Sequence, residues 1–362
     1  MGKKSPKAVT KVLDTTLRDG SYAVGFQFTA ADTASIAEAL EKAGVALIEI
    51  GHGVGLNASK RGYGEAAESD EGYLKAASRA LKKATFGMFC IPGIARLEDI
   101  DMAADYGMGF IRIGTDVTRV QSSKAFIARA KKHGMFVSAN LMKSYAMEPK
   151  KFARQARLTE QFGSDLLCVV DSAGGMLAGD LERYFEAVRD VSRIPLAFHG
   201  HNNLGLAVAH TLRAVELGAV IVDGSLQGMG RGAGNTPTEI LVVTLKRMGI
   251  DVGIDPLAVM DIGEKYVRPL IRRRGIGCLD VMAGYAQFHS SYMGTIRHYS
   301  SKYHVDPRKL ILGVSQVDKV DASPALVERV AQRLRNSGEE VFTAKYDFDE
   351  YIGHEQDGFS KR

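Results

Sequence analysis

Two histidines one residue apart, His199 and His201, stand at the end of an apolar run and are the first candidates for chemistry. Side chains two positions apart on a β-strand point to the same side, so both imidazoles can approach one ion. A carboxylate, Asp19, follows another apolar run directly after Arg18. Each feature also has a structural interpretation, with the histidines on the surface and Arg18–Asp19 as a salt bridge at a strand end. Together they favour a metal site.

One carboxylate with two imidazoles suits Mn²⁺, Mg²⁺, Co²⁺ or Zn²⁺ and leaves positions open for substrate and water. We expect Mn²⁺ first among these ions. A 2-oxo acid could occupy the open positions through its carboxylate and keto oxygens. The metal would then stabilise, as a Lewis acid, the enolate that remains when the adjacent carbon–carbon bond breaks. Arg18 is placed to neutralise the same developing negative charge.

The elements that must position these side chains follow the rhythm of a parallel (β/α)8 barrel, the TIM-barrel fold. Short apolar runs recur at intervals of roughly thirty residues, and the segments between them, such as Asp32–Lys42, place apolar residues at helical spacing. Thr29 could cap that first helix. We assign residues 1–250 to this catalytic domain. The eight runs are Val12–Leu17, Ala46–Gly51, Thr85–Ile91, Phe110–Gly114, Phe136–Leu141, Leu166–Asp171, Leu196–His199 and Val220–Leu226.

The strand–helix alternation stops after Met248. Residues 251–335 contain helical stretches at Pro256–Tyr266, Gln287–Tyr303 and Pro324–Leu334. We expect them to form a helical C-terminal extension that packs near the barrel mouth as a lid and as a contact surface for partners. Residues 336–362 are rich in acidic and aromatic residues without a clear period, which predicts a flexible tail or one that docks onto a neighbour.

The composition is that of an ordinary globular protein, with 45% hydrophobic residues, 25% charged residues and a net charge of +5. Basic and acidic residues are interspersed and form no aromatic-interleaved patch, so we expect no nucleic-acid function. No apolar run reaches the length of a membrane span, and the N-terminus lacks the apolar core of a signal. The widely spaced Cys90, Cys168 and Cys278 suit a reducing compartment. We therefore expect a cytoplasmic protein without membrane contact.

Three segments at matching barrel positions resemble the signatures of the DRE-TIM metallolyases, the group of 3-hydroxy-3-methylglutaryl-CoA lyase. They are Leu13–Gly20 (LDTTLRDG), His199–Leu206 (HGHNNLGL) and Gly228–Asn235 (GMGRGAGN). The glycines of the third segment could let backbone amides approach an anion, although a tight turn would need similar residues. Three signatures together are far more specific than any one of them.

Within that group, the chain most resembles the 4-hydroxy-2-oxovalerate aldolases of aromatic catabolism, from about Val12 to Leu334. The glycine segment has the aldolase form, because it lacks the acidic residue that acyl-CoA condensing synthases usually carry there. The other segments that carry the resemblance are Arg18–Ser21, Gln27–Thr29, Gly51–Gly53, Asp171–Gly175, Gly284–Ala286 and Ser290–Ser291.

The resemblance implies a role for each matching residue. Asp19, His199 and His201 would be the metal ligands. Arg18 would stabilise the enolate, and Ser172 would help to hold the carboxylate of pyruvate. The activity implied is a class II aldolase that cleaves or makes a 4-hydroxy-2-oxo acid, with pyruvate and an aldehyde as the two halves. The alternatives are an acyl-CoA-dependent condensing enzyme of the same superfamily and a biosynthetic aldolase with a different acceptor.

The sequence departs from these aldolases at two positions. Tyr22 stands where they have a histidine general base, and His289 stands where they have an active-site tyrosine before Ser-Ser. Our hypothesis is that the pair has exchanged roles, with His289 taking the proton of the C4 hydroxyl and Tyr22 donating a hydrogen bond. Histidine suits the base because its ordinary pKa is ~6.5, against ~10 for tyrosine. The alternative is that the base lies elsewhere or is a water.

The resemblance also implies partners. Such aldolases usually form a complex with an acylating aldehyde dehydrogenase, and the helical extension is the expected docking surface. We also expect a homo-oligomer. The acidic, aromatic segment Glu339–Phe359 is not typical of the family, which keeps a standalone enzyme or one with a different partner as alternatives.

Overall fold

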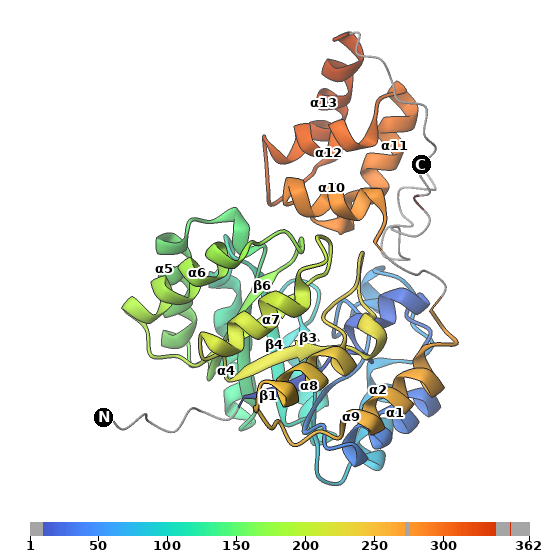
Figure 1. The fold of residues 1–362 in the computed structure, drawn as a ribbon, viewed down its shortest axis with the longest axis vertical. Helices are drawn as coiled ribbons and strands as arrows, with labels where there is room; N and C mark the ends of the chain where they lie inside the picture. The colour runs from blue at the N-terminus through green and yellow to red at the C-terminus, as the bar shows by residue number, and fades with distance from the viewer. Residues whose placement is uncertain (1–9, 272–275, 338–347, 349–362) are drawn as a thin grey trace.

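The computed structural model describes residues 10–271, 276–337 and 348. Eight parallel strands close into a barrel in sequence order, with β8 paired to β1 (Figure 1). The predicted (β/α)8 fold is confirmed, and each predicted strand overlaps an observed one. The strands are β1 Lys11–Asp14, β2 Leu47–Glu49, β3 Thr85–Cys90, β4 Phe110–Asp116, β5 Phe136–Met142, β6 Leu166–Asp171, β7 Leu196–Gly200 and β8 Ile221–Gly224.

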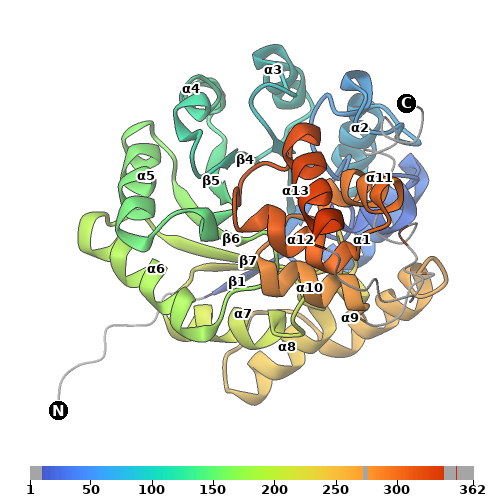
Figure 2. The ribbon, with the colours of Figure 1, turned by 90° about the horizontal axis from the view of Figure 1, so that it is seen from above.

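A ring of helices surrounds the barrel, as the view from above shows (Figure 2). The first helix begins at Thr29, whose side chain accepts the backbone N–H of Asp32 in a reciprocal capping box, as the sequence predicts. The helices of the ring are α1 Ala30–Lys42, α2 Asp70–Ala80, α3 Leu97–Asp105, α4 Lys124–Lys132, α5 Pro149–Gln161, α6 Ala178–Val191, α7 Ala207–Glu216 and α8 Thr238–Arg247.

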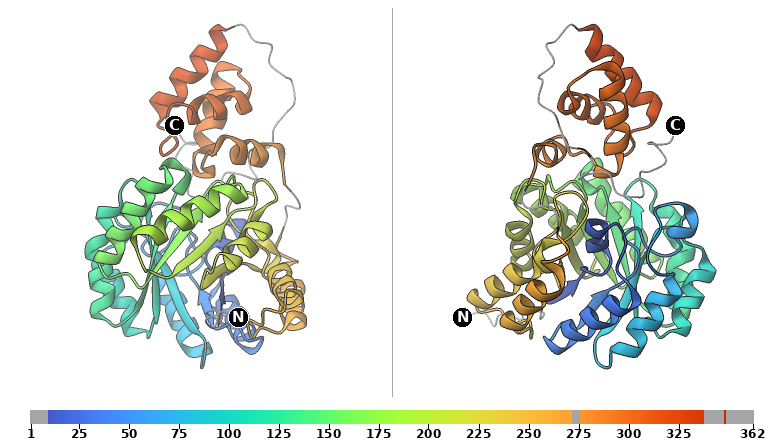
Figure 3. Two further views of the ribbon diagram at one scale, coloured as in Figure 1. Left: turned by 60° about the vertical axis from the view of Figure 1, so that its left-hand side comes forward. Right: turned by 90° about the vertical axis from the view of Figure 1, so that its right-hand side faces the viewer.

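The C-terminal helices occupy two places. Helix α9, Pro256–Ile262, packs against α8 and α1 on the barrel wall. Helices α10 Cys278–Ala286, α11 Met293–Tyr303, α12 Pro307–Ser315 and α13 Pro324–Asn336 form a separate apolar core at one end of the barrel (Figure 3). The expected helix over Gln287–Tyr303 is wrong at its start. Gln287 has a left-handed backbone, with φ of 53°, and ends α10, so the next helix begins only at Met293.

Close contacts hold α10–α13 over the carboxyl ends of the strands. A Cβ atom on Gly175, in the loop after β6, would lie 2.2 Å from the carbonyl oxygen of Gly284 in α10. Lys143, after β5, donates through Nζ to the carbonyl of Val320 at 2.6 Å. The glycine-rich segment Asp171–Gly175 therefore serves partly as the contact surface for α10.

For the predicted tail and for membrane spans, the structure gives evidence only over the residues that it describes. Most of the predicted tail, residues 338–347 and 349–362, lies outside the described residues. Among the described residues, none of the helices is both long and apolar enough to cross a membrane.

Candidate active site

The side chains of Asp19, His199 and His201 come together at the carboxyl ends of the strands. One ligand atom from each lies within 4.8 Å of the other two, and all three residues are buried. Asp19 begins a short 3-10 turn after β1, whereas His199 and His201 lie in β7 and directly after it. The alternation of side chains along β7 thus brings both imidazoles to the carboxylate, as expected from their spacing.

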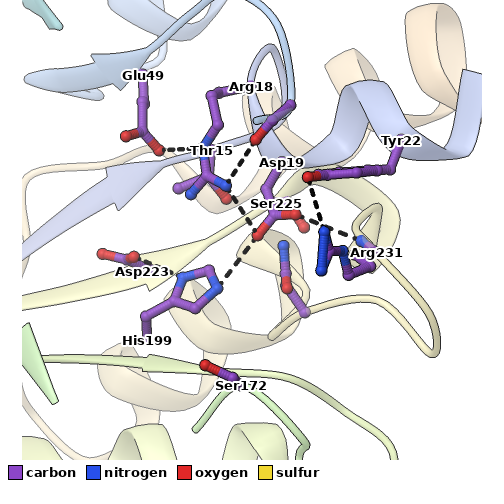
Figure 4. Close-up of polar contacts among 12 residues, drawn as sticks. Thr15, Arg18, Asp19, Tyr22, Glu49, Ser172, His199, Asp223, Ser225 and Arg231 are labelled. Carbon is purple, nitrogen blue, oxygen red and sulfur yellow. Dashed lines mark hydrogen bonds and ion pairs between the residues drawn. The ribbon is translucent and has the colours of Figure 1, made fainter. Parts of the chain in front are cut away.

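The proton on His199 is fixed by a second carboxylate. Nδ1 of His199 lies 2.7 Å from Oδ2 of Asp223 in β8, while Nε2 faces Oδ2 of Asp19 at 3.2 Å (Figure 4). A ring that donates from Nδ1 keeps its Nε2 lone pair for a metal. Burial lowers the pKa of His201 to about 3, which favours the neutral imidazole that can bind an ion.

Buried charges surround the three possible ligands. Arg18 donates from Nε to Glu49 Oε2 at 2.7 Å and lies 3.3 Å from Asp19. Arg112, in β4, donates to the same Glu49 oxygen at 2.9 Å and to Asp223. These five side chains comprise three carboxylates and two guanidinium groups, so one negative charge remains for a positive partner.

The pKa values of the possible ligands are set by their charged neighbours. Burial opposes ionisation of Asp19, but Arg18 and the two histidines outweigh it and hold its pKa well below the usual range. Burial also opposes the charged form of His199, yet its hydrogen bonds to Asp19 and Asp223 raise its pKa. The carboxylate, the imidazole lone pairs and the charge balance all fit a divalent cation at this position.

A cavity of about 460 Å³ lies above these residues and is lined by all seven side chains that the sequence singles out. Besides Asp19, His199 and His201, these are Arg18, Tyr22, Ser172 and His289. Ser172 follows β6, and its Oγ accepts the backbone N–H of Lys143 at 2.9 Å. The C-terminal helices contribute His289, Tyr292 and Thr295 to the lining, so the cavity lies between the barrel and these helices.

Tyr22 and His289 are joined through Arg231. Nη2 of Arg231 donates to Oη of Tyr22 at 3.0 Å (Figure 4), and Nη1 lies 3.0 Å from Nδ1 of His289. The guanidinium also lies over the Tyr22 ring, 4.6 Å from its centroid. Burial, with repulsion from Arg231 and Lys143, holds the pKa of His289 well below its usual range.

The glycine segment Gly228–Asn235 positions Arg231 by folding back on the histidine strand. Asn202 donates its backbone N–H to the carbonyl of Gly234 at 2.9 Å, and the backbone N–H of Arg231 lies 3.4 Å from Asp19 Oδ1. Gly234 has φ of 81°, and a Cβ atom there would lie 2.1 Å from the carbonyl oxygen of Gly228. The glycines are therefore needed for a tight turn that carries Arg231 into the cavity.

Sequence reasoning did not select Arg231 as a site residue. The available signal was a single charged side chain between glycines after the last barrel strand. Lys143, in the loop after β5, also lines the cavity, whereas Lys60 and Arg61 are exposed and outside its lining.

The fold and the residues at its mouth define a barrel enzyme with a carboxylate and two imidazoles converging on one point. The HMGL-like family model matches residues 10–265, and the chain belongs to this family. It is 41% identical over 324 residues to a 4-hydroxy-2-oxovalerate aldolase of Moorella thermoacetica, covering 89% of this chain and 96% of that protein. A 4-hydroxy-2-oxovalerate aldolase of Carboxydothermus hydrogenoformans is 39% identical over 331 residues, covering 91% and 98%.

These relatives confirm the predicted family and the predicted class of enzyme, a carbon–carbon lyase. Among solved structures, the carboxyl transferase domain of Rhizobium etli pyruvate carboxylase with 3-hydroxypyruvate superposes with a TM-score of 0.75. It is 16% identical, and the match covers 92% of this chain and 61% of the other. At that identity the likeness concerns the fold alone.

Proposed function

We propose that the protein is a divalent-metal-dependent class II aldolase that cleaves a 4-hydroxy-2-oxo acid into pyruvate and an aldehyde, or joins them. The observation that carries the proposal is the convergence of Asp19, His199 and His201 beside Arg18, within one cavity. The names of the relatives support a 4-hydroxy-2-oxo acid as substrate. They do not favour the alternative of an acyl-CoA-dependent condensing enzyme.

Asp19, His199 and His201 would hold the metal, with Mn²⁺ as our first expectation. When bound, the ion supplies Lewis-acid stabilisation to the oxygen on which negative charge develops. Asp223 keeps His199 in the tautomer that such binding requires.

Arg18 and Ser172 would bind the pyruvate half. Arg18 is held by Glu49 at 2.7 Å, which fixes its guanidinium before any substrate arrives. A preorganised cation stabilises developing negative charge without reorganisation at the moment of reaction. The Ser172 hydroxyl accepts the N–H of Lys143, so its own proton is available to donate to the substrate carboxylate.

His289 and Tyr22 would serve the C4 hydroxyl in the exchanged roles, His289 as base and substrate contact, Tyr22 as hydrogen-bond donor. Both line the cavity and both contact Arg231. In His289→Ala, we expect kcat to fall by about 10²- to 10⁴-fold, the usual contribution of a general base. Tyr22→Phe should retain most of the activity. The reverse pattern would contradict the exchange.

The C-terminal helices would also form the contact surface for a partner, either a second copy of the chain or an acylating aldehyde dehydrogenase. On α10, the side chains of Val281 and Tyr285 are exposed, Tyr285 by 69%. Sedimentation of the purified protein, alone and with such a dehydrogenase, measures both associations. Substituting Tyr285→Ser should weaken whichever association uses α10.

The proposed activity is tested by pyruvate release from racemic 4-hydroxy-2-oxovalerate and longer or more polar analogues. The assay uses Mn²⁺-loaded enzyme and a chelator control. Chelator-sensitive release is the expected result. Failure to release pyruvate from any of these compounds would contradict the proposal.

A further inference from the structure

We infer that the aldehyde half of the substrate carries a carboxylate and that Arg231 binds it. The substrate class is then a 4-hydroxy-2-oxo dicarboxylic acid. This inference rests on the proposed aldolase function and names the acceptor that the site selects.

The position of Arg231 brings its positive charge next to the aldehyde half of the substrate. Its backbone N–H lies 3.4 Å from Asp19, and its guanidinium contacts Tyr22 and His289, at 3.0 Å each. Those two side chains are the groups proposed to serve the oxygen on C4. A substituent on C4, or one carbon further out, therefore lies next to the guanidinium.

The charges on the acceptor side of the cavity suit an anionic group. Of the four cations among the described residues that line the cavity, Arg18 and Arg112 already contact the buried carboxylates of Glu49 and Asp223. The other two, Arg231 and Lys143, face one carboxylate of the lining, Asp116, which contacts Lys143. With a divalent ion offsetting the negative charge of the metal ligands, the lining around Arg231 keeps a positive charge for a second anionic group of the substrate.

A carboxylate is the anionic group that best matches the geometry. A planar guanidinium binds a planar carboxylate through two parallel hydrogen bonds. The guanidinium of Arg231 lies over the Tyr22 ring, with 4.6 Å between the guanidinium carbon and the ring centroid, and this cation–π contact helps to position it. Because Arg231 and Lys143 also repel a proton from His289, a bound carboxylate would lessen this repulsion and make His289 a stronger base.

The reaction inferred for the simplest such substrate is balanced. In 4-hydroxy-2-oxoglutarate, the C4 hydroxyl loses its proton, the C3–C4 bond breaks, and its electron pair moves into the enolate of pyruvate. Protonation at C3 then gives pyruvate, and C4 leaves as the aldehyde carbon of glyoxylate. No oxidant, reductant or further reactant is needed.

The first test compares two substrates that differ in the C4 substituent, 4-hydroxy-2-oxoglutarate and 4-hydroxy-2-oxovalerate, with the Mn²⁺-loaded full chain. We expect kcat/KM to favour the dicarboxylate by about 10- to 100-fold, the usual contribution of a charge-assisted hydrogen bond. In Arg231→Met this ratio should fall close to one. Arg231→Lys, which keeps the charge without the planar fork, should give an intermediate ratio. Arg61→Ala, which removes an exposed arginine outside the cavity lining, is the matched control and should keep the wild-type ratio.

The second test measures binding without turnover. Neither 2-oxoglutarate nor 2-oxovalerate has a C4 hydroxyl to be cleaved, and calorimetric titration should show tighter binding of 2-oxoglutarate in the wild type but not in Arg231→Met. Equal binding of the two, or preferential cleavage of 4-hydroxy-2-oxovalerate, would overturn the inference and leave the aldolase proposal standing. Absence of pyruvate from every 4-hydroxy-2-oxo acid would overturn both.

Discussion

The two sides of the cavity are built differently. On the metal side, Asp19, Arg18 and His199 are held by buried carboxylates and guanidinium groups that come from strands or their ends. On the acceptor side, Tyr22 comes from a 3-10 turn, Arg231 from a glycine loop, and His289 from the position before the 3-10 turn Ser290–Tyr292, and all three are only partly buried. The metal side is thus fixed by the barrel itself, whereas the acceptor side depends on loops and on the C-terminal helices.

This difference indicates where substrate preference can change at little cost to the fold. Each charge on the metal side contacts another buried charge, so replacing one leaves its partner uncompensated. The acceptor side joins the metal side through the 3-10 turn that contains both Asp19 and Tyr22, and through the backbone N–H of Arg231, which lies 3.4 Å from Asp19. The exchange of histidine and tyrosine that we propose at positions 22 and 289 lies entirely on the acceptor side.

The largest effect is expected from Asp19→Asn, which breaks the metal side. We expect loss of stoichiometric Mn²⁺ binding and of pyruvate release to the detection limit, since the only charged ligand of the three is removed. Metal content after gel filtration is the direct measurement. Glu38→Gln, which removes an exposed carboxylate on α1, is the control and should bind metal normally. Normal metal content in Asp19→Asn would contradict the ligand assignment.

Arg18→Lys should come next, because it keeps the charge but loses the fork that contacts Glu49 and Asp19. We expect kcat to fall by about 10²- to 10³-fold, as on removal of an oxyanion-stabilising donor. Metal affinity should change little. A large loss of metal with unchanged kcat at saturating Mn²⁺ would assign Arg18 to support of the ligands instead.

Asp223→Asn should weaken metal binding indirectly, through its contact with His199. Arg112 and His199 both contact one oxygen of Asp223, which an amide oxygen can replace, but the negative charge that stabilises the proton on His199 Nδ1 is lost. We expect metal affinity to fall by about 10- to 100-fold, the usual effect of losing a group that orients a ligand histidine. Competition with a fluorescent chelator measures this change. Unaltered affinity would mean that the tautomer of His199 is fixed by another contact.

The pH profile tests the acceptor side. A base acts in its neutral form, and the pKa of His289 is held well below its usual range, so activity should persist as pH falls through ~6.5. In Arg231→Met, one cation beside His289 is lost, and the acidic limb of kcat/KM should move upward toward ~6.5. An acidic limb at the same pH in both proteins would show that His289 is not the titrating base.

The smallest effect is expected at the contact between the barrel and α10. In Gly175→Ala, the new Cβ would meet the carbonyl of Gly284 at 2.2 Å, and we expect a loss of about 1–3 kcal/mol in the free energy of unfolding. Gly179→Ala is the control, since its Cβ would meet only Arg183, at 3.9 Å, within helix α6. Urea denaturation compares the two variants. Equal stability of the two variants would show that the backbones of Gly175 and Gly284 can move apart at no measurable cost.

The metal side was predictable from the sequence because its residues lie at strand ends and the barrel brings all strand ends together. His199, His201 and Asp19 needed only the alternation of a strand and the closure of the sheet. Arg231 was not predictable, because its place depends on the left-handed glycines around it and on where α10 and α11 seat His289. Helix α10 itself was not predicted, since its nine residues are apolar at most positions around the helix and show no clear alternation of apolar and polar faces.

The most direct test of the account is exchange of the C3 protons of pyruvate in D₂O, followed by NMR without any aldehyde present. If the metal side forms the pyruvate enolate, the Mn²⁺-loaded enzyme should replace the methyl protons with deuterium, and a chelator or Asp19→Asn should stop the exchange. A protein that binds Mn²⁺ stoichiometrically yet leaves the methyl protons of pyruvate unexchanged, while releasing no pyruvate from any 4-hydroxy-2-oxo acid, would contradict the account.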